Sequence, residues 1–176
     1  MKVKLSLATA LLLVCSVALG QDKNAPAMDP AMMEAMMKTG TPGDAHKALE
    51  PFVGSWTTKV TSWMAPGAPP IVMQGSSESR WVMGGRYLEE RFKSTFLGTP
   101  FEGLGYTGYD NVKKQYWGTW MDSMSTGVMT SVGGPDGKVW SFRGTMPDPM
   151  TGADSTVNNQ ITVTDDYLET PWTWTY

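Results

Sequence analysis

Apolar and polar residues alternate with a period of two along most of the chain after residue 52. Such alternation is typical of strands that bury one face. It predicts about nine strands, at residues 53–63, 71–83, 87–96, 101–110, 115–122, 126–133, 138–146, 155–163 and 168–176. The connections are short, rich in Gly, Pro, Asp and Asn, and too short for a helical crossover. We therefore expect an all-β chain forming a single antiparallel up-and-down β-barrel of about 9–10 strands.

A helical period replaces the alternation just before the strands. Asp29 can cap a short helix, Pro30 suits its first turn, and Gly40 with Pro42 ends it. One face of this helix carries a stripe of methionines, namely Met28, Met32, Met33, Met36 and Met37. We expect this apolar face to pack against the barrel or to plug it.

The first 20 residues have the pattern of an export signal. A basic start precedes an uncharged run over residues 5–19, and small residues stand before a cleavage site after Gly20. The run is shorter than the ~20 residues of a membrane span. A lipoprotein anchored on Cys15 is the competing hypothesis, although Val14 occupies a place where a small residue is expected. We predict a periplasmic or secreted protein with a signal at 1–20, a tether and Met-rich helix at 21–45, and a barrel domain at 46–176.

Charge and cysteine content narrow the possible partners. The chain carries 14 Lys and Arg against 17 Asp and Glu, and loss of Lys2 and Lys4 with the signal leaves a formal charge of −5. Nucleic acid and anionic lipid are therefore not expected partners. Cys15 is the only cysteine, so the exported chain would fold without disulfides. Eight Trp, six Tyr and five Phe suit a barrel interior lined by rings.

Polar residues on predicted inward faces indicate where a ligand could be fixed. Glu90 falls on the apolar face of the strand at 87–96, where a carboxylate is exceptional. The next two strands place further carboxylates beside aromatic or aliphatic residues of the same face. The candidate residues of the lumen are Glu90, Phe92, Glu102, Tyr106, Trp120 and Asp122.

Six stretches recur in the order of a known family. They read GSW at 54–56, WMAPGAPP at 63–70, WVMGGRYLEE at 81–90, FEGLGYTGYDNVKK at 101–114, TWMD at 119–122 and MPDPMTG at 146–152. Over residues 41–166 the chain thereby resembles an uncharacterised bacterial family, domain of unknown function 1579. The resemblance implies a calycin-like barrel, with lipocalins and haem-binding nitrobindins as distant relatives, and implies no particular reaction.

The resemblance also bears on the two ends of the barrel. In lipocalins a tryptophan at the corresponding place packs across the closed end, which implies that Gly54 and Trp56 form a structural floor. The residues at 170–176 depart from the family, whose members usually continue with charged strands. If a strand is missing, the first and last strands would present an open edge that could pair with another chain.

Neither haem nor copper is predicted. Haem requires an axial ligand inside the barrel, and the only histidine, His46, precedes the first strand on what we expect to be a solvated loop. Cu(I) could bind thioethers of the methionine stripe, but no His or Cys accompanies them. We predict no metal and no catalytic residue, since the chain has no Gly-x-Ser-x-Gly, Cys–His or His-Glu metal motif.

The favoured hypothesis is non-catalytic binding of a small, mainly apolar ligand in the lumen. The first alternative is a structural or interaction module whose barrel is filled by side chains. The second is an enzyme that uses Glu90, Glu102 and Asp122 as carboxylates with raised pKa values. A cavity of about 300 Å³ or more would favour the first hypothesis over the filled barrel.

Export can be checked on the expressed protein. We expect the full chain, expressed in a Gram-negative bacterium, to yield a periplasmic form whose intact mass begins at Gln21. A mass that retains residues 1–20, or one that carries a lipid on Cys15, would contradict the predicted cleavage.

Overall fold

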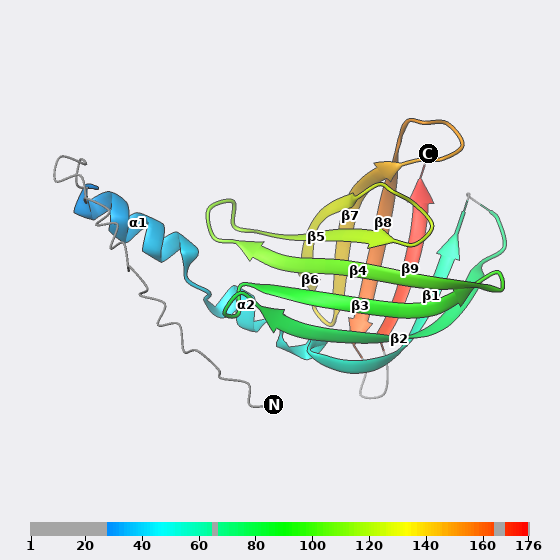
Figure 1. Ribbon diagram of the computed structural model, residues 1–176, viewed down its shortest axis with the longest axis horizontal. Helices are drawn as coiled ribbons and strands as arrows, with labels where there is room; N and C mark the ends of the chain where they lie inside the picture. Colours follow the sequence, from blue (N-terminus) through cyan, green and yellow to red (C-terminus); the bar gives the residue numbers. More distant parts are fainter. Residues whose placement is uncertain (1–27, 65–66, 164–167, 176) are drawn as a thin grey trace, which may run out of the picture.

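The computed structural model describes residues 28–64, 67–163 and 168–175, the last strand by its backbone. The predicted export signal and most of the tether lie outside the described residues. Within these ranges, nine strands close into a barrel (Figure 1). They are β1 (Gly54–Trp63), β2 (Ile71–Val82), β3 (Tyr87–Phe96), β4 (Thr99–Asp110), β5 (Gln115–Asp122), β6 (Met129–Asp136), β7 (Val139–Pro147), β8 (Asp154–Val163) and β9 (Leu168–Thr175). The predicted all-β, up-and-down barrel is confirmed.

The barrel closes through its first and last strands. Each strand pairs antiparallel with the next, and β1 pairs in parallel with β9 from Thr58↔Leu168 to Trp63↔Thr173. The parallel pair follows from the odd number of strands, because the first and ninth strands of an up-and-down order run in the same direction. The open edge considered in the sequence analysis is therefore not present between these two strands, because β1 and β9 are hydrogen-bonded to each other.

The largest boundary error concerns β6. The sequence pattern predicts that this strand ends at Gly133 and that the following Gly, Pro and Asp form a turn, whereas β6 continues to Asp136. Gly133 is needed for close approach rather than for a turn, since a Cβ there would overlap the backbone of Ser141 in β7. Pro135 is tolerated because β5 pairs with β6 only as far as Gly133.

The Met-rich helix forms but does not pack on the barrel. Helix α1 (Pro30–Gly40) begins at Asp29, whose carboxylate accepts a hydrogen bond from the Ala31 N–H at 2.9 Å. It has no buried residue, and its methionines are 48–68% exposed. Asn111 of the β4–β5 turn donates hydrogen bonds of 2.8 Å to the carbonyls of Thr39 and Thr41. This anchor holds the C-terminal end of α1, and the helix projects away from the strands (Figure 1). The expectation that its methionine face packs against the barrel or plugs it is therefore wrong.

Two short helical elements close one end of the barrel. α2 (Asp44–Lys47) and the 3-10 helix η1 (Glu50–Phe52) bring Leu49 and Phe52 beneath the strands. There they form the closing cluster, which we define as Leu49, Phe52, Leu88, Trp140 and Phe142. The Tyr116 hydroxyl donates to the Ala45 carbonyl at 2.9 Å and so ties the entry segment to β5.

His46 belongs to this closed end and is not solvated. It is 5% exposed, its ring meets Tyr109 edge to face at 5.8 Å, and its Nδ1 accepts a hydrogen bond from the Gly43 N–H at 3.1 Å. Burial lowers the pKa of His46, because the charged imidazolium would lose its hydration. The sequence expectation of a solvated loop is therefore wrong, although His46 does lie outside the barrel interior.

Tryptophan packing decides which face of β4 points inward. The ring of Trp120 on β5 lies over Gly103 and Gly105 of β4, and a Cβ at Gly103 would overlap that ring. The intervening Leu104 must then point outward, because successive residues of a strand face opposite sides. Glu102 and Tyr106, predicted from the sequence to lie in the lumen, share this outward face with Leu104.

Substitution of Gly103 should test this packing. We expect Gly103→Ala to lower the free energy of unfolding by about 1–3 kcal/mol, because the added methyl must displace the Trp120 ring. Gly40→Ala is the control, since a Cβ at this exposed helix end would meet nothing within 4 Å. Urea unfolding of both variants gives the measurement, and equal stability of the two would contradict the proposed constraint.

Candidate ligand-binding site

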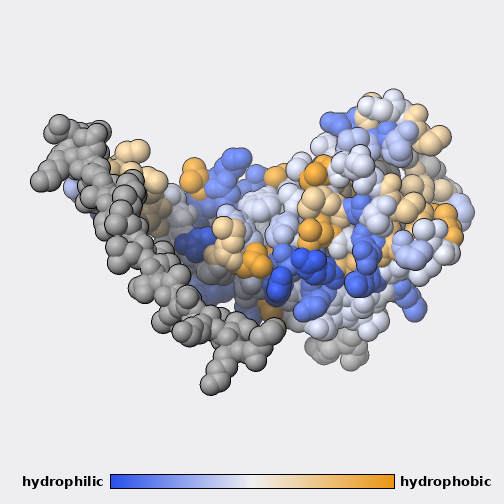
Figure 2. Space-filling view, viewed as in Figure 1, coloured by the Kyte–Doolittle hydropathy of each residue, from blue (hydrophilic) through white to orange (hydrophobic). Residues whose placement is uncertain are grey.

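A cavity of about 850 Å³ occupies the barrel interior beyond the closing cluster. Its walls come from inward-facing strand residues, and its mouth from two loops at the opposite end, residues 123–128 and 148–153. On the outer face, hydrophobic groups gather near this loop end (Figure 2). The walls are mainly apolar, with a small number of polar groups.

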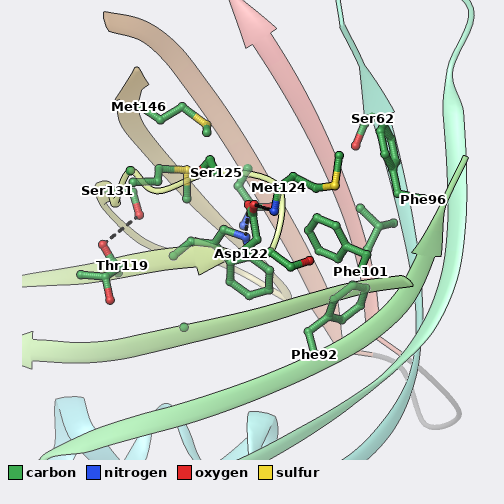
Figure 3. Close-up of a pocket in the computed structure, with 18 of the residues that line it drawn as sticks. Ser62, Phe92, Phe96, Phe101, Thr119, Asp122, Met124, Ser125, Ser131 and Met146 are labelled. Carbon is green, nitrogen blue, oxygen red and sulfur yellow. Dashed lines mark hydrogen bonds between the residues drawn. The ribbon is translucent and has the colours of Figure 1, made fainter. Parts of the chain in front are cut away.

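The middle of the cavity is an apolar chamber. Val60, Met73 and Phe92 are buried there, and Phe96, Phe101 and Trp120 pack against them. The ring of Phe92 lies 5.8 Å from that of Phe101, edge to face, and 6.0 Å from that of Trp120. Figure 3 shows Phe92 and Phe101 directed into the same space. These rings offer large, rigid contact surfaces to an apolar ligand.

Methionines line the cavity from wall to mouth, and sequence analysis did not single them out. They are Met64, Met73, Met124, Met129, Met146 and Met150. Met73 stands two residues after Ile71 on β2, a spacing that is typical of one face of a strand. Unbranched, polarisable thioethers adapt to differently shaped partners, which suits a cavity that accepts variable apolar groups.

A layer of polar side chains lies between the apolar chamber and the closing cluster. Each of three members stands two residues from a side chain packed on that cluster: Thr58 from Trp56, Glu90 from Leu88, and Asn159 from Ile161. Because strand side chains repeat on one face every two residues, this layer sits directly above the cluster. We call the inward residues Thr58, Glu90, Thr107, Ser131 and Asn159 the polar belt.

Glu90 is the charged member of the polar belt. Its Oε1 accepts a hydrogen bond of 2.7 Å from the Ser77 hydroxyl of β2. No Lys, Arg or His within the described ranges forms an ion pair with it. Burial raises the pKa of Glu90, and the Ser77 hydrogen bond opposes this shift without cancelling it. Its remaining exposed surface belongs to the cavity wall.

Two buried atoms of the belt have no hydrogen-bond partner in the part of the chain that the structure describes. They are Thr58 Oγ1 and Asn159 Oδ1, in residues that are 3% and 9% exposed. Both residues line the cavity. Buried polar atoms are nearly always paired, because an unpaired one costs free energy of desolvation. These two atoms therefore mark places where a bound molecule or water would be stabilised.

Asp122 shapes the mouth rather than the belt. Its Oδ1 accepts a hydrogen bond from the Met124 N–H at 2.9 Å, and its Oδ2 accepts one from Trp120 Nε1 at 3.2 Å. Asp122 and Met124 lie together at the loop in Figure 3. The carboxylate thus fixes both the start of the 123–128 loop and the orientation of the Trp120 ring.

The barrel that holds this cavity matches a known sequence family. The profile of the family described as Protein of unknown function (DUF1579) matches residues 41–169. The chain belongs to this family. The matched segment contains every described residue that lines the cavity. A comparison with curated proteins found no significant match. Because the DUF1579 family has no assigned function, the function of this member is inferred from the geometry of its cavity.

The structure brings four of the six predicted lumen residues to the cavity. Glu90, Phe92, Trp120 and Asp122 line it, whereas Glu102 and Tyr106 do not. The Glu102 side chain is 70% exposed and lies 3.8 Å from Lys93 Nζ. The predicted lumen placement of Glu102 and Tyr106 is therefore wrong. The Trp120 ring packs on Gly103 and Gly105 at the inner face of β4, so the alternate residues Glu102 and Tyr106 face outward.

Tyr106 instead joins an ionic network on the outside of the barrel. Its hydroxyl donates to Glu89 Oε2 at 2.9 Å, while Arg80 and Arg91 each approach Glu89 Oε1 at 2.9 Å. Hydrogen bonds from Arg80 first, then Tyr106 and Arg91, lower the pKa of Glu89 to about 2. Arg80 thus helps to link β2, β3 and β4 on the outer face of the barrel.

Trp56 packs where a floor residue would. It contacts the closing cluster, and its Nε1 donates to the Phe52 carbonyl at 2.9 Å. Gly54 has a φ of +130°, which favours glycine over other residues. Neither residue is among the described residues that line the cavity.

Two properties of the described residues bear on metal binding and membrane crossing. Within them, no group of three or more His, Cys, Asp or Glu could hold a metal ion. None of the described helices has the length and apolarity needed to cross a membrane.

Neutralising Glu90 should raise stability at neutral pH. Because the folded state raises the pKa of Glu90 above its ordinary value, ionisation opposes folding, and stability is lost as pH rises through the folded pKa. We expect Glu90→Gln to raise the melting temperature by several degrees at pH 7.5, with the gain vanishing below about pH 4. Thermal melting between pH 4 and 8 measures this.

Glu78→Gln is the matched control for that experiment. Glu78 is exposed on β2 beside Ser77, so the same change of charge is made outside the barrel. A Glu90→Gln variant that melts at a lower temperature than the unsubstituted protein at pH 7.5 would contradict the claim that ionised Glu90 destabilises the fold.

Proposed function

We propose that this protein binds a small, mainly apolar molecule in its barrel without transforming it. The observation that carries the proposal is the cavity of about 850 Å³. Ligand sites are typically mainly apolar clefts of about 300–1,000 Å³ with a few placed polar groups. The apolar chamber and the polar belt have this composition. A barrel filled by side chains, the alternative hypothesis, would leave no such space.

The polar groups of the cavity favour binding over catalysis. Asp122 is engaged by Trp120 and the Met124 N–H, and the only described partner of Glu90 is Ser77. No His or Cys is among the described residues that line the cavity, so these carboxylates have no thiol or imidazole beside them. Glu102, the third carboxylate of the enzyme hypothesis, lies outside.

We also propose that binding takes place outside the cytoplasm, in a protein related to the calycin-like barrels. The export pattern of residues 1–20 supports the location, and the closed up-and-down order of strands supports the relationship. In a periplasmic or secreted setting, the closed end would keep one end of a bound molecule from water, while the mouth at the other end admits it.

Binding can be tested with N-phenyl-1-naphthylamine, an uncharged dye that fluoresces in apolar surroundings. We expect saturable binding, and we expect Phe101→Ala to raise Kd about tenfold, because it removes one aromatic wall worth about 1–1.5 kcal/mol. Phe101 is only partly buried, so its truncation should leave the fold intact.

Glu102→Ala provides the control at the next position. Its side chain faces solvent, and its pairing with Lys93 is exposed and weak. We expect this variant to bind the dye as the unsubstituted protein does. Lack of saturable dye binding by the folded, unsubstituted protein would overturn the proposed function.

A further inference from the structure

The polar belt presents hydrogen-bond acceptors that have no donors. Asn159 Oδ1 can only accept, and neither it nor the Thr58 hydroxyl oxygen has a partner among the described residues. One oxygen of Glu90 likewise has no hydrogen bond with any described residue. All three residues line the same cavity at the level just above the closing cluster. Asn159 Oδ1 and the second carboxylate oxygen of Glu90 need a molecule that brings N–H or O–H groups to the deep end, while the Thr58 hydroxyl can accept or donate.

The charge in the cavity has one sign. Glu90, Asp122 and Asp148 line it, and no Lys, Arg or His is among the described lining residues. Residues 163–176, whose side chains are not described, contain no basic residue in their sequence either. An anionic ligand would therefore meet like charge without a counter-ion, whereas a cation would supply the missing partner of Glu90.

Aromatic rings stand one step above the polar belt. Phe92 follows Glu90 on the inner face of β3, and Trp120 packs against Phe92 at 6.0 Å. Ring faces attract ammonium groups, the more so where water is excluded. The same rings accept the apolar part of a ligand, so the chamber suits a molecule that is cationic at one end and apolar over the rest.

We propose that the ligand is a cationic amphiphile whose protonated amine is held at the polar belt, with its apolar part in the apolar chamber and toward the mouth. An alkylammonium has three N–H donors, and the belt offers acceptors on Glu90, Thr58 and Asn159. From Glu90 to Phe96 the chamber follows six residues of β3, about 20 Å along the strand. This assignment rests on the proposed binding function and adds the chemical class of the ligand.

Competition among three molecules with the same ten-carbon chain tests the assignment. Decylammonium, 1-decanol and decanoate are used to displace N-phenyl-1-naphthylamine at pH 7.5, below the concentrations at which they form micelles. We expect decylammonium to displace the dye at about one tenth of the concentration that 1-decanol needs, and decanoate to be the weakest competitor. Competition by decanoate or 1-decanol equal to that of decylammonium would overturn the cationic assignment.

Two variants separate a site at the belt from general attraction to an acidic protein. We expect Glu90→Gln to bring decylammonium to the level of 1-decanol, with each competitor referred to that variant's own Kd for the dye. Glu78→Gln, which removes the same charge from the outer face of β2, should keep the preference. Loss of the preference in both variants, or in neither, would place the amine elsewhere and overturn the inference. If the dye itself does not bind to the unsubstituted protein, the proposed binding function, on which this inference rests, is overturned instead.

Discussion

The closing cluster is the constraint on which the rest of the molecule depends. Nine strands enclose more space than their inward side chains fill, and an unfilled barrel open at both ends would admit water throughout. Leu49 and Phe52, carried in by short helical turns ahead of β1, meet Leu88, Trp140 and Phe142 at one end only. These five buried residues seal that end of the barrel, and the interior beyond them is left as a cavity whose mouth lies at the opposite end.

Glycine makes room for the aromatic walls of that cavity. Trp120 can lie flat on the barrel wall because Gly103 and Gly105 have no side chains beneath it, and Asp122 holds its indole N–H. Large rings on one strand are thus matched by missing side chains on the next. The same arrangement sends Glu102 and Tyr106 to the outside, where Tyr106 helps Arg80 and Arg91 to bind Glu89.

Sequence periodicity was sufficient for the barrel but not for every face of it. Alternation and turn residues predicted the strands and their meander order, because each strand has one buried face and short connections. On β3 the inward set containing Glu90 and Phe92 could be read directly. On β4 the rule that large residues point inward failed, since the space was already taken by Trp120 from a neighbouring strand. The burial of His46 and the parallel β1–β9 pair likewise depend on contacts between distant segments, which a local pattern does not contain.

The polar belt is difficult to explain as a device for stability. A barrel that only needed a filled core would carry apolar side chains directly above the closing cluster, yet Thr58, Glu90 and Asn159 stand there with unused hydrogen-bonding capacity. Unpaired acceptors and a carboxyl of raised pKa both lower the stability of the empty protein. A ligand that supplies donors would offset that cost, because any molecule that binds only the folded state stabilises it. The polar belt thus lowers the stability of the empty protein, and a bound ligand that donates hydrogen bonds to it would restore that stability.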